Sequence, residues 1–276
     1  MSIEKISLAR ARRIALAAGL KAKGRGKEAT LNAVEHLGYV QIDTISVIER
    51  AHHHVLWSRQ PGYRAAYLDA LLAEDRTVFE HWAHAVSYLP MGDYRFYLEK
   101  FERFRRPPTA KWQKERHATA KPLLKKVLKR IEDEGPLSSR DFEDLSKKDA
   151  GGWWDWKPAK VALEYLYLQG HLMVSERRNF QRHYDLPERV LPPGLDLTTP
   201  PAEERADHQV RRALQSMGLA RESEISKYLE LSSRAQIRAG LKRLLSRGEI
   251  VEVGVKGLAD ETYCISAETL GAAGSP

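Results

Sequence analysis

The sequence predicts an α+β protein that is mainly helical and is built from tandem winged-helix units, three in all. Its 276 residues are enough for two or three small domains, each with a core of its own. Proline-rich stretches at 105–109 and 192–201 mark two breaks in the chain. The parts on either side of the second break share one pattern of helix, glycine and hairpin. We therefore expect units at 1–106, 107–191 and 192–270, with a disordered tail at 271–276.

The shared pattern is a helical run of apolar residues that stops at a glycine and continues into two short β-type runs. Gly170 and Gly248 stand where helices commonly end on a left-handed residue. Upstream, 137–141 and 219–225 predict a short strand or turn that enters a capped second helix. Hairpin strands are expected at 171–176 and 182–186 in one unit, and at 249–253 and 261–265 in the other. Three helices followed by a hairpin make a winged helix.

The first unit follows the same plan with weaker signals. Ser7 is a good cap for a first helix, and a second helix at 29–37 would stop at Gly38. A third helix is expected directly after Asp43. The stretch 77–89 is rich in valine and aromatic residues, which favour strands, so it predicts another hairpin.

Composition limits the cellular context and the class of partner. The chain has 45 Lys and Arg against 37 Asp and Glu, and this net charge of +8 favours a polyanionic partner. Its one cysteine, Cys264, allows no internal disulfide or multi-cysteine zinc site, and its neighbours favour a strand. The sequence shows neither a signal-peptide pattern nor an apolar run near the roughly 18 residues of a membrane span. We expect a cytoplasmic protein that contacts no membrane.

Basic residues cluster in two places where winged helices touch DNA. A helix capped by Ser232 or Ser233 carries cations every fourth residue, so that they share one face. The hairpin tip at 176–184 holds three arginines together with Asn and Gln. Both clusters fit DNA phosphates, and the alternative for each is a merely solvated surface. The predicted contacts are Arg234, Arg238 and Lys242 on the helix, and Arg177, Arg178 and Arg182 in the hairpin.

Three of the six tryptophans fall in the stretch 151–160. One ring, for which we choose Trp154, could stack on an exposed base, with Lys157 and Lys160 on phosphates. Alternatively, at least two of the rings join domains, since tryptophan is more often a core residue. The histidines at 52–54 cannot converge on one metal ion, because consecutive helical residues project about 100° apart.

The stretch Gln41-Ile42-Asp43 allows two interpretations. Asp43 before an apolar run has the pattern of a helix N-cap. If the stretch is extended instead, Ile42 points inward while Gln41 and Asp43 emerge together on the other side. An amide and a carboxylate placed in this way could hold a water molecule between them.

Four stretches together resemble the YcaQ-type (AlkX/AlkZ-like) winged-helix DNA glycosylases, which unhook interstrand crosslinks. They are LGYVQIDT at 37–44, EHWAH at 80–84, GWWDWKP at 152–158 and ERRNFQR at 176–182. In that family a Gln-apolar-Asp or Gln-apolar-Gln triplet is catalytic. The resemblance therefore implies that Asp43 is the catalytic carboxylate, that Gln41 positions the water, and that His84 is a neighbour of the active site.

The resemblance also implies a reaction and a partner. The expected activity is hydrolysis of the N-glycosidic bond of bulky N7-alkylated purines, including crosslinked ones, in double-stranded DNA at the bacterial nucleoid. It implies no cofactor, no metal and no obligatory protein partner. The family usually continues into a C-terminal β-barrel-like domain, which we expect to be absent here. The alternative is a noncatalytic winged-helix regulator, in which Asp43 is a helix cap and the helix from Ser232 reads base edges.

Overall fold

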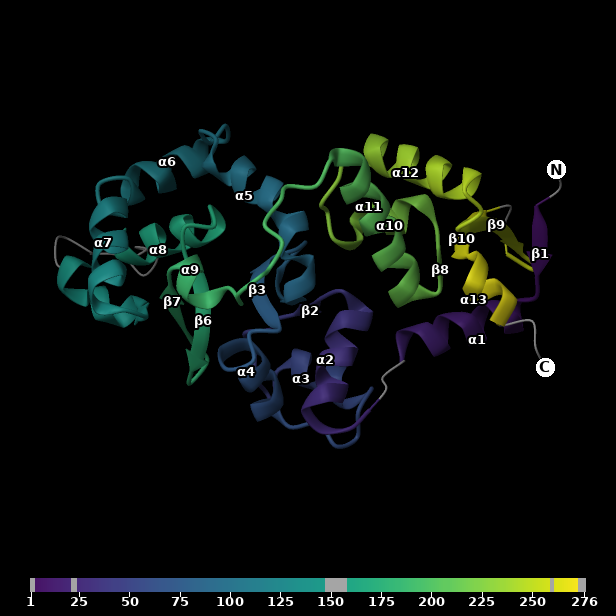
Figure 1. Cartoon of the computed structure of the whole chain (residues 1–276), viewed down its shortest axis with the longest axis horizontal. Coiled ribbons are helices and arrows are strands. Elements are labelled where there is room, and N and C mark those ends of the chain that lie inside the picture. Colours follow the sequence, from purple (N-terminus) through teal and green to yellow (C-terminus); the bar gives the residue numbers. More distant parts are fainter. Residues whose placement is uncertain (1–2, 21–23, 147–157, 259–260, 273–276) are drawn as a thin grey trace. The chain divides into compact units, whose positions relative to one another are not determined.

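The computed structural model describes residues 3–20, 24–146, 158–258 and 261–272 (Figure 1). It is an α+β structure dominated by helices, as the sequence predicted. The chain forms two compact units: unit 1 comprises Met1–Tyr67, Trp82–Pro90 and Thr199–Pro276, and unit 2 comprises Leu68–His81 and Met91–Thr198. This division differs from the three consecutive segments expected from the proline-rich breaks. No helix in the described ranges is both long and apolar enough to cross a membrane.

One order of elements recurs along the described chain: helix, short strand, two helical elements and two strands. The first set is α2 (Gly26–Leu37), β2 (Val40–Gln41), α3 (Ala51–Trp57), α4 (Ala65–Ala73), β3 (Val78–Trp82) and β4 (Val86–Pro90). The second is α7 (Leu124–Glu134), β5 (Leu137–Ser138), the 3₁₀ element η2 (Ser139–Ser146), α8 (Pro158–Leu168), β6 (Met173–Arg178) and β7 (Gln181–Asp185). The third is α10 (Ala202–Met217), β8 (Leu219–Ala220), α11 (Glu222–Tyr228), α12 (Arg234–Ser246), β9 (Ile250–Val255) and β10 (Thr262–Ser266).

The remaining elements stand outside these sets. They are β1 (Glu4–Ile6), α1 (Leu8–Gly19), the 3₁₀ element η1 (Met91–Tyr97), α5 (Leu98–Arg105), α6 (Lys111–Ala120), α9 (Pro187–Val190) and α13 (Ala267–Ala272). Gly271 and Ala272 are thus helical rather than disordered, and 273–276 lie outside the described residues.

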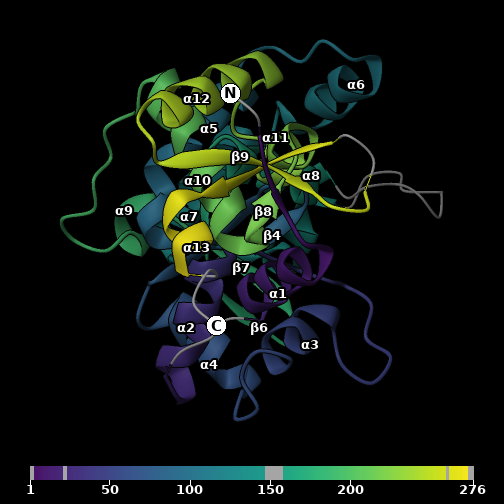
Figure 2. The ribbon, with the colours of Figure 1, turned by 90° about the vertical axis from the view of Figure 1, so that its right-hand side faces the viewer.

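Unit 1 contains a four-stranded sheet in the order β1-β9-β10-β8. The N-terminal strand β1 pairs in parallel with β9, with Glu4 opposite Val253, so both ends of the sequence meet in one sheet (Figure 2). Ile6 and Ile14 pack with Val253 under this sheet. Beside it, α10 and α12 enclose a second apolar cluster with β9 and β10. This long-range pairing is the reason that residues 3–20 belong with the third predicted segment.

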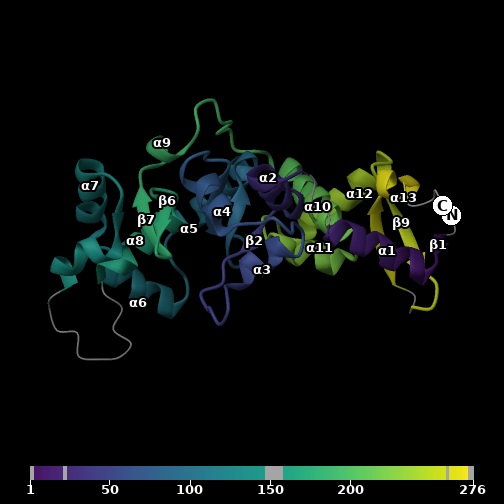
Figure 3. The same cartoon turned by 90° about the horizontal axis from the view of Figure 1, so that it is seen from below.

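Unit 2 contains a three-stranded sheet in the order β5-β7-β6. The β6–β7 hairpin pairs Arg177 with Arg182, and it turns at Asn179 and Phe180, which both have positive φ. Helices α6, α7 and α8 lie together with this hairpin (Figure 3). Buried side chains from α7, η2 and α8, among them Ile131, form the core. The hairpins predicted for the second and third segments are therefore confirmed to within about two residues.

Local signals placed several helix ends correctly and one helix start wrongly. Ser7 caps α1, Gly38 ends α2 with a φ of 71°, and Ser233 caps α12 with a capping box. The helix predicted directly after Asp43 does not begin there: residues 42–50 are irregular, and α3 begins at Ala51. Asp43 is therefore not the N-cap of that helix.

Candidate active site

The Gln41-Ile42-Asp43 stretch has the extended geometry of the second interpretation. Strand β2 pairs antiparallel with β4, and the Ile42 N–H continues the ladder to the Val86 carbonyl at 2.8 Å. The alternation of an extended chain buries Ile42, which is 7% exposed, and turns Gln41 and Asp43 to the opposite side. An amide and a carboxylate therefore leave the backbone side by side.

Both side chains line one open cavity of unit 1, with a volume of about 440 Å³. Its wall is built from two distant parts of the sequence, because α10 and α11 contribute to it as well as the segment 37–59. The lining residues are Leu37, Tyr39, Val40, Gln41, Asp43, Ala51, His52, Val55, Arg59, Ser216 and Tyr228. Apolar, aromatic, amide, carboxylate and guanidinium groups thus converge on a single space.

The Asp43 carboxylate is oriented by its own loop. Its Oδ1 accepts the Ile45 N–H at 2.9 Å, and its backbone N–H donates to His52 Nδ1 at 3.2 Å. Because Nδ1 accepts that bond, the His52 proton resides on Nε2. His52 is 1% exposed, so this contact fixes the backbone of Asp43 from the protein interior. The carboxylate therefore has a defined position, and in the described chain its Oδ2 has no hydrogen-bond partner.

Two tyrosines and an arginine complete the cavity. The rings of Tyr39 and Tyr228 meet edge to face with centroids 5.1 Å apart, and the Tyr228 hydroxyl donates to the Leu37 carbonyl. Burial raises the pKa of both phenols further above neutral pH, so both hydroxyls are protonated there. Arg59 donates to the Val55 carbonyl at 2.7 Å and brings the positive charge of the cavity.

A family model described as "DNA glycosylase AlkZ-like" matches residues 34–276, which include the cavity and its Gln-Ile-Asp triplet. The chain belongs to the AlkZ-like DNA glycosylase family. Among solved structures, it is similar to the Streptomyces sahachiroi DNA glycosylase AlkZ, with a TM-score of 0.69 and 16% sequence identity. That match covers 98% of this chain and 72% of the other. At this identity the match shows a shared fold.

His84 of this AlkZ-like chain is not among the residues that line the cavity, but it packs against Tyr39, which is. Its imidazole meets the Tyr39 ring edge to face, with centroids 5.0 Å apart. Two other histidines have structural contacts: His53 Nδ1 is 2.7 Å from the Tyr63 hydroxyl, and His81 is buried among aromatic rings. In the described part of the chain, no three His, Cys, Asp or Glu side chains are grouped so that they could hold a metal ion.

The hairpin arginines of this AlkZ-like protein divide into two kinds. Arg177 binds the Glu80 carboxylate through Nε and Nη2 at 2.8 and 2.9 Å, and Arg182 binds the same carboxylate through Nε. Glu80 is fully buried, and the Arg177 side chain is only 7% exposed. Burial by itself would raise the pKa of Glu80, but the two guanidinium groups outweigh it and hold that pKa below its usual value. Arg177 and Arg182, two of the three hairpin arginines predicted to contact DNA, are therefore engaged in ion pairs with Glu80.

Arg178 points away from that ion pair. Its side chain is 67% exposed, and within the described residues it hydrogen-bonds to the carboxylate of Glu176 at 2.5 Å. The sequence could not separate Arg178 from Arg177 and Arg182, because all three share one short turn. Glu80 lies in a different strand, so the partner that distinguishes them is about 100 residues away. Arg177 and Arg182 stay predicted contacts, but their guanidinium groups are already bound to Glu80 inside unit 2, so Arg178 is the most exposed of the three hairpin arginines.

The predicted helix stripe is exposed in the structure. Arg234 and Arg238 both contact Glu222 on the surface, and they remain 67% and 55% exposed. Lys242 is exposed on the same helix. Lys160 is exposed near the start of α8. Two further predicted contacts, Trp154 and Lys157, lie outside the described residues.

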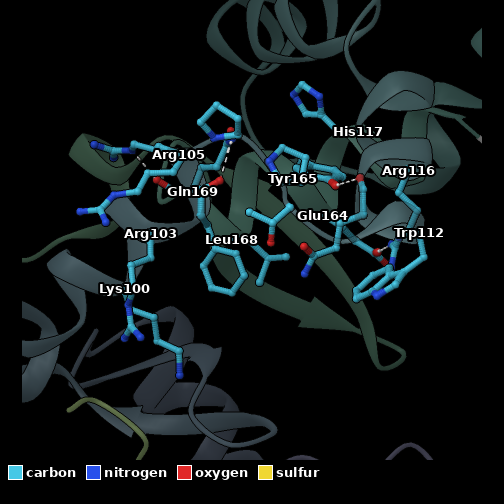
Figure 4. A pocket seen from close by; sticks show the side chains of 16 residues that line it. Lys100, Arg103, Arg105, Trp112, Arg116, His117, Glu164, Tyr165, Leu168 and Gln169 are labelled. Carbon is cyan, nitrogen blue, oxygen red and sulfur yellow. Dashed lines mark hydrogen bonds and ion pairs between the residues drawn. The ribbon is translucent and has the colours of Figure 1, made fainter. Parts of the chain in front are cut away.

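A second cavity, which the sequence did not suggest, lies in unit 2 between α5, α6 and α8, and its volume is about 580 Å³. Figure 4 shows arginines of α5 on one side and Trp112 and Arg116 on the other. Trp112 is 58% exposed, whereas Arg116 is held by Glu164 at 2.5 Å. The sequence marked 105–109 only as a break between domains. Arg106 and the exposed Trp112, which both line this cavity, were missed because they belong to no repeating pattern.

Proposed function

We propose that this chain hydrolyses the N-glycosidic bond of N7-alkylated purines in duplex DNA, including purines joined in interstrand crosslinks. The observation that supports this most strongly is the pairing of Gln41 with Asp43 on one open cavity, in a member of a DNA glycosylase family. We propose further that each of the three recurring sets of elements is a winged helix.

The chemistry asks little of the protein beyond a placed carboxylate and a water molecule. Alkylation at N7 makes the purine a cationic leaving group, so the bond from C1′ to N9 breaks with its electron pair going to N9. The sugar then resembles an oxocarbenium ion, which the Asp43 carboxylate stabilises. The water held between Gln41 and Asp43 adds its oxygen to C1′ and transfers a proton to the carboxylate. The released base leaves neutral, and no redox step is required.

The open form of the cavity suits a bulky target. A crosslinked base is tethered to the opposite strand and cannot turn fully into a closed pocket. Gln41 is exposed, and we propose that the Arg59 guanidinium, which lines the cavity, binds a phosphate of the target nucleotide. An enzyme that reaches the C1′ atom of the target nucleotide from an accessible surface can act without complete base flipping.

Exposed cations would hold the duplex. We propose contacts from the β6–β7 hairpin, from α12 and from the start of α8, all to the phosphate backbone. Those residues are Arg178, Arg234, Arg238, Lys242 and Lys160, together with Lys157 as predicted from the sequence, while Trp154 would stack on an exposed base. Phosphate contacts carry no base information, so recognition of the lesion would come from the cavity.

Replacement of Asp43 by Asn tests the proposal. Base release would be measured under single-turnover conditions from duplexes with one N7-methylguanine or one nitrogen-mustard crosslink. We expect the Asp43→Asn rate to fall by about 10²- to 10⁴-fold, because the amide cannot take a proton or stabilise a cation. DNA affinity, measured by fluorescence anisotropy, should be unchanged. Glu35→Gln is the matched control, because it removes an exposed carboxylate of unit 1 outside the cavity.

Two results would contradict the proposal. Equal rates for wild type and Asp43→Asn would remove Asp43 from the chemistry. DNA binding by the wild type without release from either substrate would favour the noncatalytic DNA-binding protein.

A further inference from the structure

The loop that follows Asp43 exposes three aliphatic side chains together. Ile45 is 70% exposed, Val47 is 89% exposed and Ile48 is 90% exposed. Single exposed apolar residues are common on protein surfaces, but a contiguous apolar group is a feature of interaction sites. The tip of the loop, Thr44 to Ile48, contains no charged residue.

Backbone contacts fix the path of the loop, whereas the aliphatic side chains of its tip do not pack into the core. Asp43 Oδ1 accepts the Ile45 N–H, and residues Ser46 and Arg50 form an antiparallel bridge. Glu49 accepts the Arg50 N–H at 2.9 Å and lies 3.9 Å from the His53 ring, so the acidic residue is turned back toward α3. The apolar tip is thus presented outward while its ends are fixed.

The tip lies next to the candidate catalytic carboxylate. An extended chain advances at most about 3.6 Å per residue, so Ile45 lies within about 7 Å of Asp43 and Val47 within about 14 Å. Stacked bases in a duplex are about 3.4 Å apart. A nucleotide whose C1′ reaches Asp43 therefore has its nearest stacking neighbours within reach of the tip.

We propose that Ile45, Val47 and Ile48 form an apolar wedge that enters a base step of duplex DNA beside the nucleotide at Asp43. This inference rests on the proposed function and adds the means by which the lesion is opened. Apolar side chains that insert between base steps unstack and kink the duplex. Isoleucine and valine are stiff at χ1, so they lose little freedom when they insert.

The same bond that holds the loop would couple the wedge to the chemistry. Ile45 N–H is bound to Asp43 Oδ1, so a wedge seated in DNA also sets the direction of the carboxylate. For a crosslinked base, which cannot leave the duplex, partial unstacking by a wedge is a route by which C1′ becomes accessible. The uncharged tip fits the stacked bases rather than the phosphates, which would require cations.

The test uses the double variant Val47→Ser/Ile48→Ser in the full chain. Both side chains are almost fully exposed, so their loss should leave the unfolding midpoint unchanged. Ile45 is kept so that the residue whose backbone N–H holds the Asp43 carboxylate is unchanged. The control is Leu197→Ser, which removes a 52% exposed aliphatic side chain from a loop of unit 2.

The direct readout is the fluorescence of 2-aminopurine placed next to N7-methylguanine in a duplex, since this base analogue brightens when it is unstacked. Proteins would carry Asp43→Asn, so that the base is not released. Asn keeps an Oδ1 that can accept the Ile45 N–H. We expect the loop variant to reduce the fluorescence rise by about threefold or more, and to slow base release from crosslinked DNA about tenfold in the Asp43 background. Leu197→Ser should change neither.

The outcomes separate the wedge from the proposed function. If the wild type releases the base and the loop variant is equally fast and equally bright, the wedge is wrong and the glycosylase stands. If the loop-dependent brightening occurs but the wild type releases no base, the wedge stands and the proposed function is wrong. Sedimentation without DNA tests self-association through the tip. If the loop variant no longer self-associates while its fluorescence rise with DNA is unchanged, the tip binds a second copy of the chain and the wedge is wrong.

Discussion

Replacing Glu80 with Gln should destabilise unit 2 strongly. The carboxylate is fully buried and accepts three N–H groups, two from Arg177 and one from Arg182. Gln offers one acceptor oxygen and no charge, so two guanidinium groups would remain buried or half-buried without their counterion. Removing one partner of a buried ion pair costs about 3–5 kcal/mol, and here one carboxylate serves two cations. We expect a loss near the upper end of that range.

Urea and thermal unfolding followed by circular dichroism would measure this loss. For a unit of this size, the midpoint of the corresponding thermal transition should fall by more than about 8 °C. The matched control is Glu176→Gln, which makes the same chemical change to the surface partner of Arg178 and should shift the midpoint little. Equal midpoints for Glu80→Gln and Glu176→Gln would refute the reasoning, because burial would then have no energetic consequence.

The pH dependence supplies a second check on Glu80. Its pKa in the folded protein is below the ordinary value, because the cations outweigh burial. A depressed pKa stabilises the fold at pH values above the pKa of the unfolded chain, and the benefit is lost as pH falls through the folded pKa. As the pH falls below about 5, the wild type should therefore lose stability, and Glu80→Gln should lose less over the same pH range. Parallel curves for the two proteins would contradict this assignment.

Two further predictions concern a helix end and the hairpin. Gly218 has a φ of +76°, and a Cβ there would lie 2.8 Å from Ile14 Cγ2 and 2.9 Å from the Ile14 carbonyl oxygen. Gly218→Ala should therefore lower the free energy of unfolding, measured with a chemical denaturant, by about 2–5 kcal/mol. Gly248 has a similar φ of +69° but open space around it, so Gly248→Ala should lower the free energy of unfolding only by the backbone strain, about 1–2 kcal/mol. Equal losses for the two variants would show that the contact with Ile14 is irrelevant. Arg178→Gln should weaken binding to all duplexes alike and lower the slope of log affinity against log salt by about 1, with no change in stability; an unaltered slope would remove Arg178 from the DNA contacts.

Local sequence patterns predicted much of the secondary structure because they depend on neighbouring residues. Ser7 and Ser233 cap helices through their own side chains, and Gly38 ends a helix because glycine accepts a positive φ. The hairpin strands were predicted from short β-type runs that follow a helix-ending glycine. These signals need no knowledge of what the elements pack against.

Part of the candidate site was also readable. Alternation along an extended chain placed Gln41 and Asp43 on one side and Ile42 in the core, as the structure has it. The competing interpretation of Asp43 as a helix cap failed because α3 begins at Ala51. An apolar run such as Ile45, Val47 and Ile48 can also lie in an exposed loop, and only its packing in the folded chain distinguishes a loop from a helix.

The sequence by itself determined the helix ends, the hairpins, the α+β class and the Gln-Ile-Asp triplet that carries the family resemblance. Only the tertiary structure decided which groups meet across long stretches of chain. It pairs β1 with β9, brings Tyr228 to the cavity of Asp43, and assigns two hairpin arginines to Glu80. A pattern within one element shows which face is buried or charged, but not which distant group satisfies it, because that partner is selected by the packing of the whole unit.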